Sequence, residues 1–320
     1  MTAANLERRL VLDAVQVTEA AAVAAWRLAG RGDEKAADQA AVDAMRTALN
    51  SLDIDGEIVI GEGERDAAPM LYIGEKVGVG EGPAIDIALD PLEGTTLTAK
   101  AQGNALAVMA WAPKGTLLNA PDTYMDKIAC GPGFAEGVID LDAPPGANVE
   151  ALARAKGVKA SEITVCVLDR PRHAEIIAAV RAAKARVILI NDGDVAGVIN
   201  TAQPETGVDL YLGLGGAPEG VLACAALKCV GGQFQGRLLF RTSDERARAE
   251  RLGLTDLERK YSLHDIVRGD AIFAATGVTQ GALLDGVRYA GGRLHTHSLV
   301  MNASSHIVRE VRMKRVLDLG

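Results

Sequence analysis

Hydrophobic positions in the first third of the chain recur with the periods of helices and then of strands. Leucine, valine and alanine repeat at three- and four-residue spacing over 5–29, which predicts a helix that Gly30 can end. A second helix is predicted over about 34–52. Short apolar stretches separated by Gly, Pro, Asp and Asn then indicate strands: EIVIGEG, MLYIGEKV, AIDIALD and ALAVMAWA.

From about residue 148 the pattern changes to an alternation of strands and helices. Helices are predicted over 149–156 and about 172–184, and from about 194 and 218, between the strands ITVCVLD, ARVILIND and DLYLGLG. Such alternation indicates an α/β layer with at least part of its sheet parallel. The last 80 residues add a charged helix, TSDERARAERLG, and strands such as DAIFAATGV and HIVREVRMKRV.

The organisation expected is one catalytic domain over 1–320 with two halves. The segment GANVEALARAKG, at 146–157, is the best candidate for the boundary, so the halves are about 1–147 and 148–320. No long linker and no internal repeat is visible. A chain of this length can bury a large core.

Composition and charge narrow the classes of partner. The chain has 48% hydrophobic and 24% charged residues, as a soluble globular protein does, and a formal charge of −8. That charge argues against a nucleic-acid or anionic-membrane partner but leaves room for one small anionic substrate. No apolar run approaches the ~18–20 residues of a membrane span.

The four cysteines form no CxxC pair and no zinc spacing. Three of them lie in strongly apolar stretches, where the expected role is that of a small buried hydrophobic residue. The N-terminal residues MTAANLERRLVLD do not have the pattern of a targeting signal. The expected compartment is therefore the reducing cytoplasm.

Acidic residues stand at the ends of several apolar runs, where ligands gather in open α/β sheets. They are Glu62 after EIVIG, Asp90 and Glu93 after AIDIAL, Asp192 and Asp194 after ARVILIN, and Glu219 after DLYLGLGGAP. Four of them have a structural alternative: a solvated turn for Glu62, a Pro91–Gly94 turn for Asp90 and Glu93, and a favourable first-turn position for Glu219. Thr95 can be an N-cap or can align a water.

Carboxylates without His or Cys are hard oxygen ligands, which select Mg²⁺ or Mn²⁺. Two such ions ~3.5–4 Å apart can clamp a phosphate and activate water, so a phosphatase would gather acids of this kind. Arg170 and Arg172 flank Pro171 after the strand ITVCVLD. Arginine at a helix start opposes the helix dipole, so a bound anion would help to explain this pair.

Taken together, these segments resemble the bacterial class II fructose-1,6-bisphosphatase family over nearly the whole chain. The stretches that carry the resemblance are IVIGEGERDAAPMLYIGEKVG, IDIALDPLEGTT, NALAVMA, the TYMDKIACGP loop, DRPRH, NDGDVA and GLGGAPEG. The DP-x-E-G-T core also looks like the signature of the lithium-sensitive sugar-phosphatase superfamily, with Glu93 where most relatives have Asp.

The resemblance implies an α/β/α/β/α sandwich, a homodimer or homotetramer, and hydrolysis of the 1-phosphate of fructose 1,6-bisphosphate in carbohydrate metabolism such as gluconeogenesis. It implies dependence on two or more Mn²⁺ or Mg²⁺ ions. By position, Asp38 and Glu62 would serve the first ion, and Asp90, Glu93 and Glu219 the second, with the Leu92 carbonyl as a further ligand. Thr95 would position the attacking water, with an acid behind it, Asp38, polarising its hydroxyl.

The substrate-binding residues implied by the resemblance lie in five segments. They are Glu93, Gly94, Thr95, Tyr124, Arg170, Pro171, Arg172, Asp192, Gly193, Asp194 and Gly216. Arg170 departs from the lysine expected in the best-known relatives, which puts its contact with the second phosphate in question.

Four alternatives stay open on the residues alone. Within the family, the enzyme would also cleave sedoheptulose 1,7-bisphosphate, or would be an inositol-phosphate or nucleotide phosphatase. A nucleotide-dependent oxidoreductase built on GLGLGGAPEG is disfavoured, because Pro218 stands where the third glycine of the dinucleotide fingerprint belongs. A sugar-phosphate sensor would not need Thr95 together with five metal-type acids.

Overall fold

The computed structural model of the chain describes residues 3–63 and 70–316. It divides into two compact units, unit 1 from Met1–Leu117 with Gly269–Gly320 and unit 2 from Leu118–Arg268. The sequence placed the division between its two halves near residue 147. The structure divides the chain elsewhere because four strands from the C-terminal part of the chain, within 272–316, join the sheet of unit 1, and such long-range pairing leaves no local signal.

Unit 1 contains a sheet and the N-terminal helices. Its helices are α1 (Ala3–Trp26), α2 (Glu34–Leu49) and α3 (Thr95–Ala99). Its strands are β1 (Asp55–Ile60), β2 (Lys76–Val77), β3 (Ala84–Glu93), β4 (Leu106–Pro113), β11 (Ile272–Gly277), β12 (Arg288–Ala290), β13 (Arg293–Asn302) and β14 (Ile307–Val316). The sheet runs β12-β13-β11-β4-β3-β1-β2, with β14 paired along β13, and only β1 and β3 are parallel among its described pairs.

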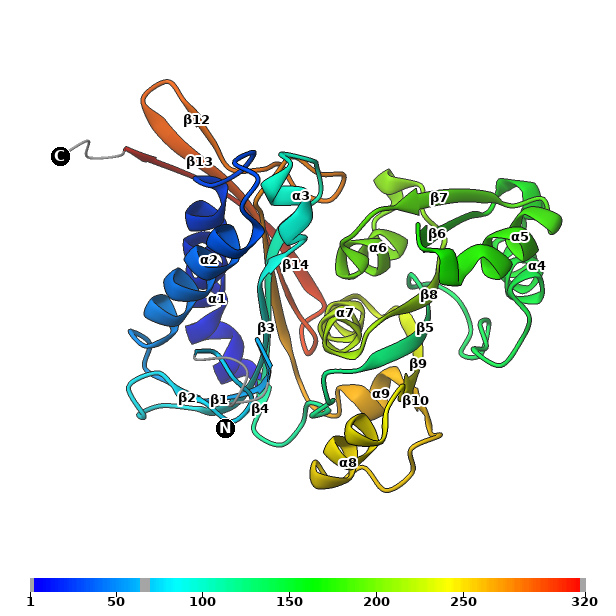
Figure 1. Cartoon of the computed structure of the whole chain (residues 1–320), viewed down its shortest axis with the longest axis horizontal. Helices are drawn as coiled ribbons and strands as arrows, with labels where there is room; N and C mark the ends of the chain where they lie inside the picture. The colour runs from blue at the N-terminus through cyan, green and yellow to red at the C-terminus, as the bar shows by residue number, and fades with distance from the viewer. Residues whose placement is uncertain (1–2, 64–69, 317–320) are drawn as a thin grey trace. The chain divides into compact units, whose positions relative to one another are not determined.

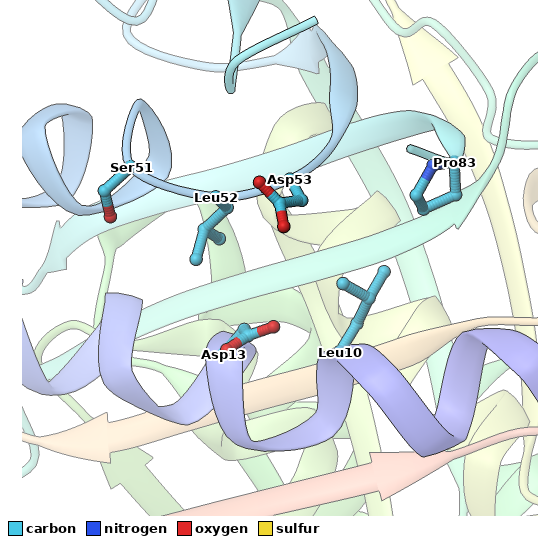
Figure 2. A pocket seen from close by; sticks show the side chains of 6 residues that line it. All are labelled: Leu10, Asp13, Ser51, Leu52, Asp53 and Pro83. Atoms are coloured by element: carbon cyan, nitrogen blue, oxygen red, sulfur yellow. The ribbon is translucent and has the colours of Figure 1, made fainter. Parts of the chain in front are cut away.

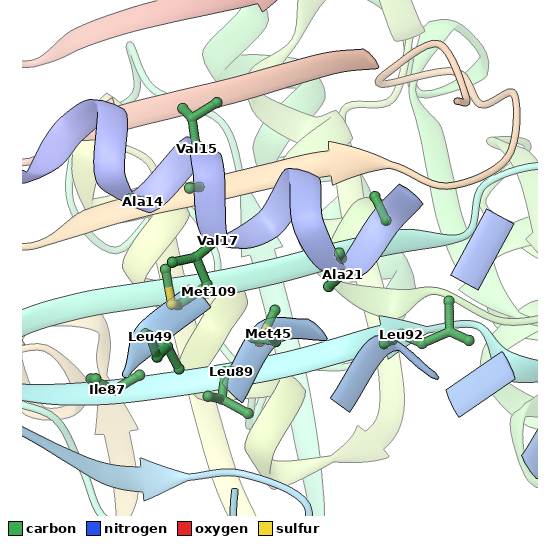
Figure 3. Close-up of a cluster of buried hydrophobic side chains, with 14 of the residues drawn as sticks. Ala14, Val15, Val17, Ala21, Met45, Leu49, Ile87, Leu89, Leu92 and Met109 are labelled. Atoms are coloured by element: carbon green, nitrogen blue, oxygen red, sulfur yellow. The ribbon is translucent and has the colours of Figure 1, made fainter. Parts of the chain in front are cut away.

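The core of unit 1 lies between the two long helices and the sheet (Figure 1). Figure 3 shows its side chains gathered between α1, α2, β3 and β4. The labelled members are Ala14, Val15, Val17, Ala21, Met45, Leu49, Ile87, Leu89, Leu92 and Met109. Alanine and valine fill most of the buried positions of α1, and α2 buries Ala37 and Ala41, so both helices can approach the sheet closely. The Asp33 carboxylate caps α2 by accepting the Ala36 N–H at 2.9 Å.

Unit 2 contains a six-stranded sheet, β10-β9-β5-β8-β6-β7. Its strands are β5 (Tyr124–Cys130), β6 (Thr164–Leu168), β7 (Arg186–Ile190), β8 (Leu210–Gly216), β9 (Gln233–Leu239) and β10 (Lys260–Ser262). Its helices are α4 (Pro145–Lys156), α5 (Ala174–Ala182), α6 (Asp194–Ile199), α7 (Ala217–Val230), α8 (Ser243–Arg251) and α9 (Leu263–Ile266). Single 3₁₀ turns occupy Ala160–Glu162, Pro171–His173, Asn200–Ala202 and Pro204–Thr206.

Helices cover both faces of this second sheet. Figure 1 shows α4 and α5 on one side of it and α6 and α7 on the other. Strand β6 is parallel to both β7 and β8, whereas β5 is antiparallel to β8 and β9. The predicted α/β sandwich class, with a partly parallel sheet, is therefore confirmed.

Two of the predicted local structures were wrong. The stretch MLYIGEKV contains only the two-residue strand β2, and TYMDKIACGP, expected as a loop, contains the central strand β5. The charged residues Asp126 and Lys127 interrupt the apolar pattern of β5. Lys127 is nevertheless buried, because Asp194 from another element neutralises it.

All four cysteines are free and buried, as the sequence predicted for three of them, and burial raises the pKa of Cys130 and of Cys166 to about 12. Among the described residues, no helix combines the length and the apolar character needed to cross a membrane.

Candidate active site

Asp38 and Glu62 form a pair of carboxylates in unit 1. Asp38 lies on the first turns of α2 and Glu62 follows the end of β1, and both are half-buried. Burial raises the pKa of both groups, and the negative charge of Asp38 helps to raise the pKa of Glu62 to about 7. A pair of like charges in partly buried positions is stabilised by a cation, so these residues suit a metal ion.

Asp90 and Glu93 lie within β3, although the sequence placed them after its end. The strand continues through Pro91, and its pairing with β4 is interrupted between Asp90 and Glu93 and resumes at Leu106. The Leu92 N–H donates to the Asp90 carboxylate at 3.0 Å, which stabilises this irregularity. Glu93 is 4% exposed. The local bend thus places one carboxylate in a buried position at the end of the strand.

Gly94, not Thr95, occupies the N-cap position of α3. Its φ of +91° is left-handed, and a β-carbon there would lie 2.9 Å from Leu97 Cδ1, so glycine is required on both counts. Thr95 is instead the first residue of the helix and is half-buried. The alternative that Thr95 is an N-cap is therefore wrong.

Glu219 lies in the first turn of α7, after the N-cap Gly216 and Pro218. Its Oε2 atom is buried, and no described residue forms a hydrogen bond with it. Burial raises the pKa of Glu219 to about 7, with a further contribution from Asp194, while Lys127 acts in the opposite direction. The favourable first-turn position that the sequence suggested is real, but it does not account for an oxygen buried in this way.

Asp194 begins α6 after Gly193, whose φ is +83° and which serves as the N-cap. The Asp192 carboxylate accepts the Gly193 N–H at 3.1 Å. The side chain of Asp194 is 7% exposed, forms an ion pair with Lys127 and accepts the Tyr211 hydroxyl at 3.4 Å.

Arg172 and Tyr124, predicted from separate segments, lie together in unit 2. The Arg172 guanidinium lies 5.1 Å from the centre of the Tyr124 ring, and its Nε and Nη2 donate to the Leu214 carbonyl at 3.0 and 2.8 Å. Arg241 lies 4.4 Å from the same ring centre. The Arg241 guanidinium forms an ion pair with the Glu245 carboxylate at 2.6 Å, so Arg172 is the better candidate of the two to bind an anion.

His173 attaches the arginine segment to the sheet. Its Nδ1 is 2.8 Å from the Leu168 carbonyl, and its Nε2 accepts the Leu214 N–H at 2.8 Å, so Nδ1 carries the proton. Burial lowers the pKa of this imidazole and favours the neutral form. Pro171 opens the 3₁₀ turn that carries Arg172, while the Arg170 guanidinium donates to the Asp169 carbonyl.

Sequence reasoning missed three residues near the predicted ones: Lys127, His173 and Arg241. A lysine inside the stretch MDKIAC was the available signal for the first, because lysine is rarely buried without an acidic partner. The other two gave none, since the Leu214 N–H that binds His173 and the Tyr124 ring beside Arg241 come from distant segments.

A family model described as "Bacterial fructose-1,6-bisphosphatase, glpX-encoded" matches residues 8–315. The chain belongs to this family. It is 46% identical to "Fructose-1,6-bisphosphatase 1 class 2" of Escherichia coli strain K12, over 98% of this chain and 97% of the relative. Proteins called "Fructose-1,6-bisphosphatase class 2" from E. coli O6:H1 and Shigella flexneri match to the same extent. The predicted family is confirmed, and with it the prediction of a phosphatase.

The carboxylates of this bisphosphatase-family chain fit a divalent cation by their chemistry. The donors are all oxygens, Asp38 and Glu62 interact as like charges, and Glu219 Oε2 is buried without a hydrogen-bond partner among the described residues. Within the described ranges 3–63 and 70–316, no group of three or more His, Cys, Asp or Glu residues forms a metal-binding cluster.

Unit 1 also has a surface hollow of about 400 Å³, away from the predicted residues. Figure 2 shows its lining between α1 and the segment after α2. The residues are Leu10, Asp13, Ser51, Leu52, Asp53 and Pro83. None of them belongs to the set that the sequence assigned to metal or substrate, so this hollow is not the predicted bisphosphatase site.

Proposed function

We propose that this chain hydrolyses the 1-phosphate of fructose 1,6-bisphosphate to give fructose 6-phosphate and inorganic phosphate. The observation that carries the proposal is the match of the bacterial fructose-1,6-bisphosphatase family to residues 8–315. The relatives with 46% identity carry that activity in their names. In the reaction a water oxygen attacks phosphorus, the bond from phosphorus to the sugar oxygen breaks, and the sugar oxygen takes a proton.

Asp38 and Glu62 would hold one divalent cation, and Asp90, Glu93 and Glu219 another, with Mn²⁺ or Mg²⁺ as the expected ions. The raised pKa of Glu62 and the buried Oε2 of Glu219 support these assignments, because each carboxylate lacks the solvation that would stabilise its charge. When bound, such ions neutralise charge on the phosphate and lower the pKa of the attacking water.

The remaining residues would bind and orient the reactants. The Thr95 hydroxyl would position the water, with the Asp38 carboxylate polarising that hydroxyl. Arg172 and Tyr124 would bind the second phosphate, a role supported by the Arg172 guanidinium beside the Tyr124 ring. Gly94, Arg170, Pro171, Asp192, Gly193, Asp194 and Gly216 complete the proposed substrate set.

Sedoheptulose 1,7-bisphosphate is the second candidate substrate, since it has the same two phosphates on a longer sugar. Arg172 beside Tyr124 favours a bisphosphate over inositol monophosphates, because a monophosphate has no second anionic group to pair with its guanidinium.

The deciding experiment measures inorganic phosphate release from fructose 1,6-bisphosphate with Mn²⁺, with Mg²⁺ and with a chelator. Sedoheptulose 1,7-bisphosphate and inositol 1-phosphate are assayed in parallel. We expect metal-dependent release from the fructose compound. Absence of release from a folded, metal-supplied protein would contradict the proposal.

We also expect a homodimer or homotetramer, measured by sedimentation, and a cytoplasmic location.

A further inference from the structure

Lys127 is a buried lysine at the centre of the sheet of unit 2. It lies on β5, between β8 and β9, and its side chain is 1% exposed. A lysine is stable in such a position only when acidic and carbonyl groups compensate for the lost hydration of its ammonium. The groups that compensate for it are also members of the proposed substrate set.

The ammonium of Lys127 connects two separate elements. It forms an ion pair with the Asp194 carboxylate at the start of α6, and it donates to the Gly216 carbonyl at 2.9 Å, at the end of β8. The hydroxyl of Tyr211, a residue of β8, donates a hydrogen bond to the same Asp194 carboxylate. Both partners of Lys127 therefore have their positions set by one cation.

Gly215 leaves the space that this contact requires. A β-carbon at Gly215 would lie 2.1 Å from Asp194 Oδ2 and 2.9 Å from Lys127 Nζ. The backbone of β8 thus approaches both groups of the ion pair closely, so the ammonium has little freedom to move.

We propose that Lys127 is a positioning residue for the sugar phosphate: it fixes the Asp194 carboxylate and the Gly216 carbonyl in the geometry that binds substrate. The inference rests on the proposed function, because that function assigns Asp194 and Gly216 to the substrate. Asp194 accepts hydrogen bonds from sugar hydroxyls, and its orientation depends on Lys127. The lysine itself acts through these two groups.

The test compares wild type with Lys127→Met, Lys127→Gln and Lys127→Arg in the full chain. Steady-state kinetics with fructose 1,6-bisphosphate are measured at saturating Mn²⁺, and circular dichroism identifies the variants that fold. In the folded variants without the ammonium, we expect KM to rise at least tenfold while kcat falls less than threefold. Lys127→Arg keeps the charge and recovers part of the affinity.

A double-mutant cycle with Asp194→Asn decides whether Lys127 acts through Asp194. We expect Lys127→Met to raise KM by less than twofold in the Asp194→Asn background, since the group that it positions is already changed. If Lys127→Met alone does not fold, the double variant is still compared with Asp194→Asn, because the double variant removes both charges of the buried pair.

Lys228→Met is the matched control. Lys228 also donates to a backbone carbonyl in unit 2, that of Val267, but it lies in the last turn of α7, away from the proposed substrate residues. We expect it to change the melting temperature and not KM. An unchanged KM in folded Lys127 variants, or full additivity with Asp194→Asn, would overturn the inference. A wild type that releases no phosphate would overturn the proposed function and this inference with it.

Discussion

Gly216 and Glu219 are spaced so that a β-carbon on the glycine would lie 1.8 Å from Glu219 Oε2. The main chain at the start of α7 thus passes directly beside the carboxylate, which only glycine allows. The closeness also explains how Oε2 becomes buried without a hydrogen-bond partner among the described residues. In GLGGAPEG, Gly216 therefore makes room for an acidic side chain rather than for a bound dinucleotide.

Gly216→Ala is expected to lower kcat/KM for fructose 1,6-bisphosphate by ~100-fold or more, because the new methyl displaces the Glu219 carboxylate. Gly146→Ala is the matched control. A β-carbon there meets only ordinary contacts, at 3.6 Å from Ala183 Cβ and 3.8 Å from the Ala179 carbonyl oxygen. Equal activity of the two variants would contradict the role of Gly216.

Glu219→Gln is expected to raise the Mn²⁺ concentration needed for half-maximal activity by about tenfold or more, since an amide is a weaker ligand than a carboxylate. The melting temperature without metal should rise or stay the same, because a buried amide replaces a carboxylate that burial disfavours. The control is Glu150→Gln, an exposed glutamate of α4. An activation curve identical to that of wild type would exclude Glu219 as a ligand.

The raised pKa of Glu62 makes the stability of the metal-free protein depend on pH. The ordinary pKa of a glutamate is 4.5, and burial raises the pKa of Glu62 to about 7 in the folded chain, so the folded state binds more protons between these values. Stability should therefore fall as pH rises from about 4.5 to about 7, and Glu62→Gln should remove part of the fall. The difference in melting temperature between pH 5 and pH 8 is expected to be roughly 2–5 °C smaller in the variant than in wild type.

Added Mn²⁺ is expected to raise the melting temperature more at pH 8 than at pH 5, because the ligands must lose their protons to bind it. A pH dependence identical in Glu62→Gln and wild type would show that Glu62 does not titrate in this range.

Arg172→Gln is expected to raise KM for fructose 1,6-bisphosphate by ~10–100-fold, as loss of a charge-assisted contact of about 1.5–3 kcal/mol implies. Turnover of a monophosphate, if measurable, should change by less than twofold. Arg181→Gln, on the exposed end of α5, is the control. Loss of both activities in equal proportion would place Arg172 at the reacting phosphate instead.

The α/β class, most helices and the family could be predicted from sequence because they depend on local pattern. Periodic apolar residues produced α1 and α2 close to the predicted bounds, and alternating segments indicated α6, β8 and α7. The acids Glu62 and Glu219 could be selected as candidates because strand ends carry ligands in such folds. Asp38 had no local signal and came from the resemblance alone.

Tertiary structure decided the features that depend on distant partners. Strand β5 could not be recognised, because Lys127 looks like a surface residue until Asp194, 67 positions later, neutralises it. Asp90 and Glu93 lie inside β3 because β4 continues to pair with the strand beyond them. The pairing of Arg172 with Tyr124 depends on the sheet of unit 2, where β5 carries Tyr124 and β8 carries the Leu214 carbonyl that holds Arg172. Sequence determines which groups are available, and burial against distant elements determines the charge and position of each one.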